Sequence, residues 1–139
     1  EYTSGPFSRT KWAARLDEIS DGASNTIAMG EIRPWCGRYA RRGWMFEDSL
    51  YFATTAPINF PTCPGEKGVP DPLRPYTDSS AGCHNIEAWN ATQGFKSCHP
   101  GGACFVFCDG SVTFLNDDID YRMYQRLGDR HDGETVGTF

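Results

Sequence analysis

The segment over residues 97–115 constrains the fold more than any other part of the chain. Two short apolar runs flank the dipeptide Asp109-Gly110, which tolerates the positive φ angles of a two-residue type I′ turn. This pattern predicts a β-hairpin. Four residues that first restrict and then free the backbone lead into its first strand: His99, Pro100, Gly101 and Gly102. His99 is therefore expected at the mouth of the hairpin.

Side chains on successive strand residues point to opposite faces of a sheet. Cys104, Val106 and Cys108 should therefore share one face of the hairpin, and Phe105 and Phe107 the other. Because both sets are apolar, both faces are expected to be buried.

Two short elements are predicted before the hairpin. The apolar spacing over residues 12–19 predicts one or two turns of helix. Residues 26–32 alternate, which predicts a strand with Ile27 and Met29 on one face. Gly30 within this strand indicates a bulge or a close backbone approach.

The rest of the chain predicts one more strand region, one loop and one helix. Aromatic residues over 41–52 predict a second strand pair or a strand and turn, and six prolines over 56–85 predict a long surface excursion. An apolar residue at each turn predicts a helix over about 119–127. Residues 116–118 offer its N-cap and Gly128 its C′ residue.

With 139 residues, the chain suits one domain, over residues 1–139, with a core of its own. The composition is rich in aromatic residues, glycine and proline, which favours loops over long helices. The fold class predicted is α+β: predominantly antiparallel β, with one short C-terminal helix and long Pro/Gly-rich loops.

The net charge of −5 argues against a nucleic-acid partner, because phosphate binding needs a basic surface. Arg38, Arg41 and Arg42 form the only basic run. A solvated loop or strand edge is the favoured interpretation, and an anion site is the alternative.

Three ordered motifs resemble one family. His99, nine further residues and Asp109-Gly110 match its His-x9-Asp-Gly signature. Residues 21–26, followed by Gly30-Glu31, resemble its Asp-Gly-Thr-Ser-Asn-Thr…Gly-Glu segment, with Ala23 replacing the threonine. The ending from Tyr124 also resembles the family's tail. The family comprises prepilin-like or pseudopilin-like proteins of planctomycete-type bacteria and carries a domain of unknown function.

The resemblance implies a disulfide-stabilised, pseudopilin-head-like fold in a secreted or cell-surface protein. Family members usually begin with a leader and a long apolar helix, so the chain, starting at Glu1, resembles their C-terminal part. The sequence has no run of the ~20 apolar residues that cross a bilayer. The motif residues, expected to be structural, are Asp21, Gly22, Ser24, Asn25, Thr26, Gly30, Glu31, His99, Pro100, Gly101, Gly102, Asp109 and Gly110.

The chain has six cysteines, and in a loop-rich chain that resembles an exported family disulfides are the natural interpretation. The candidates are Cys36, Cys63, Cys83, Cys98, Cys104 and Cys108. A bridge between Cys63 and Cys83, which flank the proline-rich loop, is the first expectation. Cys104 and Cys108 should not pair with each other, because four strand residues separate them by ~13 Å. A zinc site is the alternative, although Cys98 and His99 are too close in sequence for the usual ligand pair.

Oxygen-bearing side chains surround the glycine turn near residue 22. Asp21 and Asn25 are candidate ligands of Ca²⁺, with Ser24 and Glu31 nearby. The favoured alternative is that Asp21 and Asn25 bond to nearby backbone groups, as short polar side chains do at turns.

Cys98, His99 and Asp109 together raise the hypothesis of a cysteine nucleophile. Cys98 is expected to be bridged in an oxidising compartment, and neighbours in an extended chain point to opposite faces. No catalytic residue is therefore assigned. His99 is expected to tie its loop to the Asp21-Gly22 turn by hydrogen bonds.

Three functions follow in order of preference. The first is a non-catalytic structural or assembly subunit, pseudopilin-like, that forms homo-oligomers or filaments or contacts another envelope protein. The second is an extracellular carbohydrate- or solute-binding module, stabilised by calcium, in which Trp35, Trp44 and Trp89 stack on sugar rings. The third is an enzyme that depends on cysteine and histidine.

Overall fold

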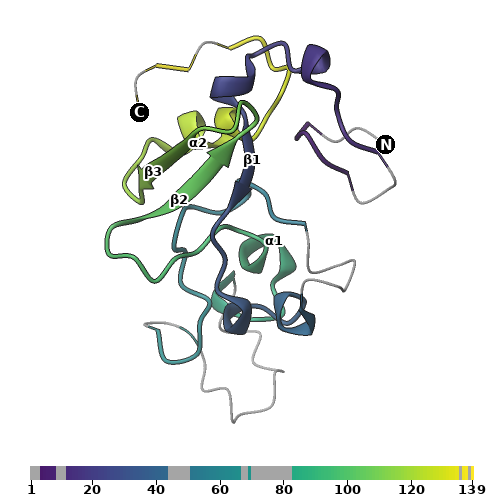
Figure 1. Cartoon of the computed structure of the whole chain (residues 1–139). Coiled ribbons are helices and arrows are strands. Elements are labelled where there is room, and N and C mark those ends of the chain that lie inside the picture. Colours follow the sequence, from purple (N-terminus) through teal and green to yellow (C-terminus); the bar gives the residue numbers. More distant parts are fainter. Residues whose placement is uncertain are drawn as a thin grey trace.

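The computed structural model describes residues 4–8, 12–43, 51–66, 69, 83–134, 136–137 and 139. A three-stranded antiparallel sheet in the order β1-β2-β3 lies at its centre. The strands are β1 (Ile27–Gly30), β2 (Gly102–Phe107) and β3 (Val112–Asn116), and helix α2 (Tyr121–Leu127) lies beside them (Figure 1). The predicted α+β fold with a short C-terminal helix is confirmed.

The other elements are short. Single turns of 3-10 helix form at η1 (Leu16–Glu18), η2 (Ala23–Asn25), η3 (Pro34–Cys36) and η4 (Ala40–Arg42), and α1 covers Trp89–Thr92. Figure 1 shows α1 at the opposite end of the molecule from α2. Of the helix predicted over residues 12–19, only the single turn η1 forms. Most of the strand predicted over 41–52 lies outside the described residues.

The predicted hairpin is confirmed, but the predicted type I′ turn is wrong. The Phe107 N–H donates to the Ser111 carbonyl at 2.9 Å, and the Gly110 N–H donates to the Phe107 carbonyl at 2.9 Å. Among the turn residues only Gly110 has a positive φ, of 86°. A type I′ turn needs two such residues, so this loop is the three-residue form with a glycine bulge. The Asp109 carboxylate accepts from the Ser111 N–H at 2.8 Å, which stabilises this three-residue loop.

The two faces of β2 alternate as predicted, yet only one of them is fully buried. Ala103, Phe105 and Phe107 are each at most 1% exposed and form the core with residues of β3 and α2. The Phe105 ring lies 6.0 Å from the ring of Tyr124. Cys104, Val106 and Cys108 are half-buried, so the expectation of two buried faces is wrong. We call the face that carries Cys104 and Val106 the outer face.

A bulge changes the faces of β1. Ile27 pairs with Phe107 and is 4% exposed, whereas Met29 pairs with Val106 and is 62% exposed. The register shifts between Ile27 and Met29, so the prediction that they share a face is wrong. The predicted close approach at Gly30 is confirmed, since a Cβ there would lie 2.5 Å from an atom of the Phe95 ring.

Helix α2 begins later than predicted. Its N-cap is Asp120, whose carboxylate accepts from the Met123 N–H at 2.9 Å, and not a residue of 116–118. Gly128 at its end has φ −86° and does not adopt the left-handed conformation expected of a C′ glycine. Glycine fits here for another reason, because a Cβ would lie 2.3 Å from Oγ1 of Thr54.

The disulfide in the structure joins Cys36 to Cys63, with 4.0 Å between the Cα atoms, so the predicted Cys63–Cys83 bridge is wrong. The buried Thr62 hydroxyl donates to the Cys36 carbonyl at 2.8 Å and holds the two segments together. Ala56, Ile58 and Cys63 are each at most 5% exposed. The first part of the predicted surface excursion over 56–85 therefore packs into the interior, while residues 67–68 and 70–82 lie outside the described residues. Cys83, Cys98, Cys104 and Cys108 are free thiols, so the expectation that they form disulfides is wrong.

Candidate functional site

A carboxylate, an imidazole and a thiol meet beside the outer face of the sheet. Glu31 directly follows β1, His99 lies in the loop before β2, and Cys104 lies in β2. One ligand atom from each of these residues lies within 4.8 Å of the other two. His99 Nε2 is 3.4 Å from Oε1 of Glu31. We call these three residues the Glu-His-Cys cluster.

The antiparallel pairing of β1 with β2 positions Glu31 in this cluster. The Glu31 N–H donates to the Cys104 carbonyl at 3.2 Å, which continues the ladder beyond Gly30. The Cys104 N–H donates to Oε2 of Glu31 at 2.8 Å. This backbone hydrogen bond, with further help from Ser97 and His99, lowers the pKa of the Glu31 carboxyl below its usual range. The result is an ionised carboxylate with one oxygen held and the other directed at His99.

Asn59 holds the loop that carries His99. It is the only residue other than glycine with a positive φ, 60°, among the described residues. Its Oδ1 accepts from the Ser97 N–H at 2.8 Å, and its Nδ2 donates to the Gly102 carbonyl at 3.2 Å. Ser97 Oγ in turn accepts from the His99 N–H at 3.0 Å. The loop is thus fixed at both ends while the His99 side chain stays 59% exposed.

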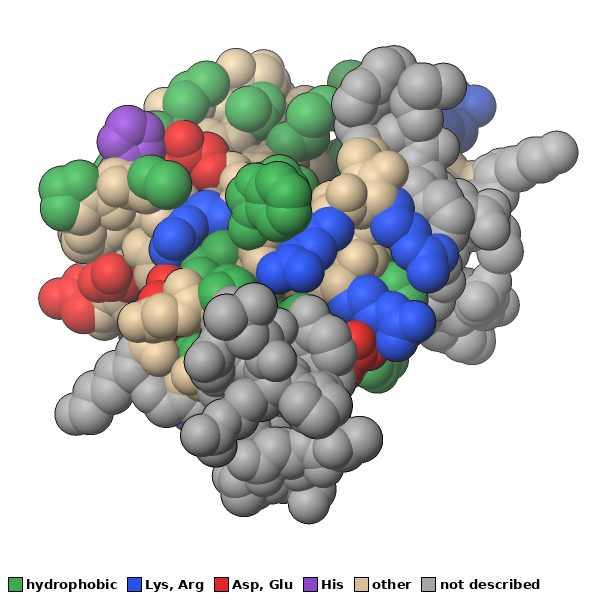
Figure 2. Space-filling view, turned by 90° about the horizontal axis from the view of Figure 1, so that it is seen from below, with side chains coloured by type: hydrophobic (Ala, Val, Ile, Leu, Met, Phe, Trp, Pro, Cys, Tyr) green, Lys and Arg blue, Asp and Glu red, His purple; other side chains and the backbone are tan. Residues whose placement is uncertain are grey.

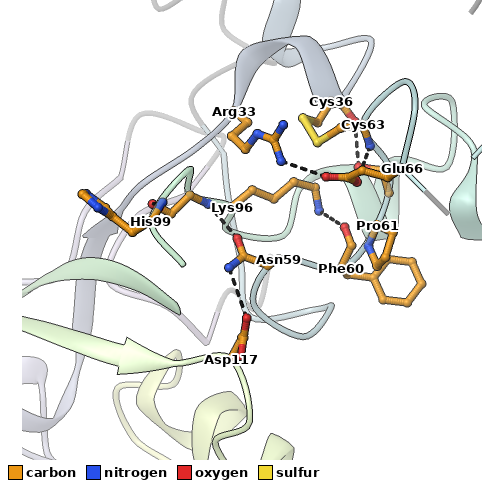
Figure 3. A network of polar contacts seen from close by, with 12 residues as sticks. Arg33, Cys36, Asn59, Phe60, Pro61, Cys63, Glu66, Lys96, His99 and Asp117 are labelled. Atoms are coloured by element: carbon orange, nitrogen blue, oxygen red, sulfur yellow. Dashed lines mark hydrogen bonds and ion pairs between the residues drawn. A yellow bond between two sulfur atoms is a disulfide. The ribbon is translucent and has the colours of Figure 1, made fainter. Parts of the chain in front are cut away.

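Figure 3 shows His99 on one side of this segment and the side chain of Lys96 running the other way. Lys96 is buried, and its ammonium donates to the carbonyls of Phe60 at 2.8 Å and Ala91 at 3.4 Å. Burial lowers the pKa of Lys96 to about 8. This lysine links the His99 loop to the segment over residues 56–63.

An ion pair between Arg33 and Glu66 supports the disulfide. Arg33 donates to Glu66 at 2.8 Å, and the other oxygen of Glu66 accepts from the Cys63 N–H at 2.9 Å (Figure 3). Polar contacts and a covalent bond therefore join the segments that carry Arg33, Cys36, Cys63 and Glu66.

Both predicted calcium ligands bond to backbone groups, as in the favoured alternative, but only Asn25 does so within its own turn. The Asp21 carboxylate accepts from the backbone N–H groups of Asp132 at 2.8 Å and Gly133 at 3.1 Å. Asn25 Nδ2 donates to the Asp21 carbonyl at 3.0 Å. Asp21 thus holds the C-terminal segment, and the predicted tie between His99 and the Asp21-Gly22 turn is wrong, because His99 contacts Glu31 instead.

The other motif residues have structural positions. Thr26 is fully buried, and its hydroxyl donates to the Gly22 carbonyl at 3.1 Å. Gly22 and Gly101 have positive φ values of 95° and 80°, Pro100 and Ser24 are exposed, and Gly102 is buried against the backbone of β3.

The expectation that Cys98 is bridged is wrong, and the sequence predicted no site role for Cys104 or Asn59. Cys98 is exposed and free, while Cys104, five residues beyond His99, joins the cluster. A signal for Cys104 was present: if β1 pairs antiparallel with β2, the residue after β1 lies beside the start of β2. Asn59 gave no such signal, because it lies in the proline-rich segment.

The outer face of the sheet is apolar on all three strands. Met29 of β1 and Val112 of β3 are 62% and 66% exposed, and Phe114 of β3 is 44% exposed. Val106 pairs with Val112, and Cys104 pairs with Phe114. The face of an antiparallel sheet that lies in water usually carries polar side chains, so the exposure of these apolar side chains is unusual.

The end of the molecule that carries α1 combines tryptophan with arginine. Trp35 and Trp89 are 73% and 61% exposed, and the Arg41 guanidinium lies 5.4 Å from the Trp35 ring centroid. Figure 2 shows Lys and Arg side chains gathered around hydrophobic ones on this face. Arg38 pairs with Glu87 at 2.7 Å. Trp44, the third tryptophan proposed to stack on sugars, lies outside the described residues.

The fold and cluster define a small disulfide-containing α+β protein with an exposed apolar sheet face. A family model described as "Protein of unknown function (DUF1559)" matches residues 2–122. The chain belongs to this family. No curated protein and no solved structure matches the chain. Within the described residues, no helix is long and apolar enough to cross a membrane.

Proposed function

We propose that this chain is a non-catalytic structural subunit of an exported, pilin-like assembly, and that copies of it associate through the outer face of the sheet. The observation that carries the proposal is the exposure of Met29, Val112 and Phe114. Exposed apolar patches of this kind mark protein interaction sites. The resemblance of the motifs to the prepilin-like family with the His-x9-Asp-Gly signature agrees with an assembly role.

The charge of the face favours a second copy as the partner. The chain carries a net charge of −5, so two copies repel each other over most orientations. The outer-face strand positions are all uncharged: Met29, Gly102, Cys104, Val106, Val112, Phe114 and Asn116. Two such faces can therefore pack as stacked sheets without bringing like charges together at these strand positions.

The size of the face predicts weak association. The longest strand, β2, has six residues and is about 20 Å long, and three strands are about 14 Å wide, which gives at most about 280 Å². A stable interface buries about 800 Å² on each partner. We therefore expect association only at high protein concentration, and tighter association where many copies are held together.

Sedimentation velocity from about 10 µM to about 1 mM protein tests this proposal. The average mass should rise with concentration for the wild-type chain and not for the Val112→Glu variant. Leu16→Glu is the matched control, because Leu16 is 69% exposed in η1, outside the sheet. A constant mass in the wild-type chain, or equal effects of both variants, would refute self-association through this face.

An extracellular location is part of the same proposal. A disulfide between two buried cysteines is typical of oxidising compartments. Detection of the intact protein in the medium or at the cell surface tests the location, and a purely cytosolic protein would contradict it.

The exposed tryptophans favour one second candidate, a carbohydrate-binding module. Trp35 and Trp89 are more exposed than tryptophan usually is, and flat aromatic rings stack on sugar rings. Such a module should be retained on polysaccharide resin, and Trp35→Ala should abolish retention. Trp12→Ala is the control, because Trp12 is 40% exposed beneath Arg130. An unretained wild-type chain would exclude this candidate for the polysaccharide used.

A further inference from the structure

We propose that the Glu-His-Cys cluster, formed by Glu31, His99 and Cys104, binds a divalent transition-metal ion of the Zn²⁺ class. The inference does not depend on the proposed assembly role. It rests on the kinds of donor atom, their separations and the contacts that orient them.

The donor atoms suit zinc in kind. The cluster offers one thiol sulfur, one imidazole nitrogen and one carboxylate oxygen, each of which is a common zinc ligand. Ca²⁺ and Mg²⁺ prefer sites built from oxygen alone, so sulfur and nitrogen donors disfavour them. Three protein ligands leave one tetrahedral position for water.

The separations also suit zinc. Nitrogen and oxygen ligands about 2.0–2.1 Å from a tetrahedral zinc ion lie about 3.3–3.4 Å from each other. His99 Nε2 and Glu31 Oε1 are 3.4 Å apart. All three ligand atoms lie within 4.8 Å of one another, and the Cys104 sulfur completes the set by moving to about 3.6 Å from the other two, the separation that tetrahedral zinc requires.

The surrounding contacts orient the ligands before any ion arrives. The Cys104 N–H holds Oε2 of Glu31 at 2.8 Å, which leaves Oε1 for the metal. Ser97 Oγ accepts from the His99 backbone N–H at 3.0 Å, and Asn59 holds the Ser97 backbone. Hydrogen bonds of this kind, which hold metal ligands in place, raise metal affinity. The 59% exposed His99 side chain keeps a path open from solvent.

Titration with Co²⁺ tests the proposal, because a thiolate bound to Co²⁺ gives a charge-transfer absorption in the near ultraviolet. The protein is handled without oxygen and without reductant, so that the Cys36–Cys63 bridge and the four thiols are kept. About 10 µM protein avoids the proposed self-association. One Co²⁺ per chain should bind with this absorption, and Zn²⁺ should displace it.

Variants identify the ligands. Cys104→Ser should abolish the absorption, and His99→Ala should weaken Zn²⁺ binding at least about tenfold. Cys98→Ser is the matched control, because Cys98 is a free, exposed thiol next to His99 and lies outside the cluster. It should leave binding unchanged. His99→Ala removes an exposed side chain, so its effect on binding is readable without loss of the fold.

Two results would overturn the proposal. The first is a wild-type chain that gives no thiolate-to-cobalt absorption. The second is binding that survives Cys104→Ser or is lost in Cys98→Ser, because the metal would then be held by another thiol. Neither result bears on the sedimentation of the chain, so the metal site and the assembly role fail separately.

Discussion

Removal of the Cys36–Cys63 crosslink should destabilise the protein strongly. The bridge closes a loop with a sequence separation of 27 residues. Closing such a loop lowers the entropy of the unfolded chain by about 12 cal/mol/K, which corresponds to about 3.5 kcal/mol at 25 °C. The unfolding entropy of a 139-residue chain is about 290 cal/mol/K, so the Cys36→Ala/Cys63→Ala double variant should melt about 12 °C lower.

The assay is thermal unfolding followed by circular dichroism without reductant. Because both cysteines are at most 3% exposed, alanine also leaves a small void, and the loss should be no smaller than the loop entropy implies. Cys83→Ser is the control, since Cys83 is an exposed free thiol. If Cys83→Ser lowered the melting temperature as much as Cys63→Ala, the bridge would join Cys63 to Cys83 and the reasoning would be refuted.

Three further comparisons test the packing and charge of the fold. Gly30→Ala should cost about 2–3 kcal/mol in chemical denaturation, because its Cβ would lie 2.5 Å from an atom of the Phe95 ring. Gly110→Ala, at φ 86° in open space, should cost about 1 kcal/mol, and equal losses would contradict the crowding at Gly30. Asn59→Ala should be about 1 kcal/mol less stable than Asn59→Gly, since both lose the amide contacts and only alanine strains the positive φ. Lys96 has a pKa of about 8 in the folded chain and its usual 10.5 in the unfolded chain, so between these pH values the unfolded chain binds more protons. The free energy of unfolding, relative to that of Lys96→Met, should therefore rise as the pH rises from about 8 to 10.5. Parallel pH profiles of the two proteins would show that the pKa of Lys96 is not lowered.

The hairpin and α2 could be predicted because their signals are local. A turn dipeptide between two apolar runs and an apolar residue at each helical turn depend on neighbours alone. The opposite faces of Ile27 and Met29 could not be predicted, because the bulge exists only in the register of β1 against β2. Likewise, Asp109 could have entered a type I′ turn, and its contact with Ser111 selects the longer loop.

Long-range choices lay beyond the sequence signals. Six cysteines allow many pairings, and the partner of Cys63 is set by the path that brings Thr62 against Cys36. His99 was assigned to the loop before the hairpin, but its contact with Glu31 follows from the pairing of β1 with β2. The role of Asn59 depends on its contact with a loop far away in sequence, and no periodic pattern of residues indicates such a contact.

The spacing between His99 and Asp109-Gly110 has a physical meaning in this fold. Those nine residues contain all of β2, so the motif fixes the length of the central strand, with His99 before one end and the turn after the other. Side chains alternate along the strand, so a change of one residue would send the phenylalanines of β2 to the outer face. The motif residues thus set the register of the sheet and bring His99 to Glu31. Cys104 is not part of the motif, and it adds to this frame the thiol that makes metal binding chemically reasonable.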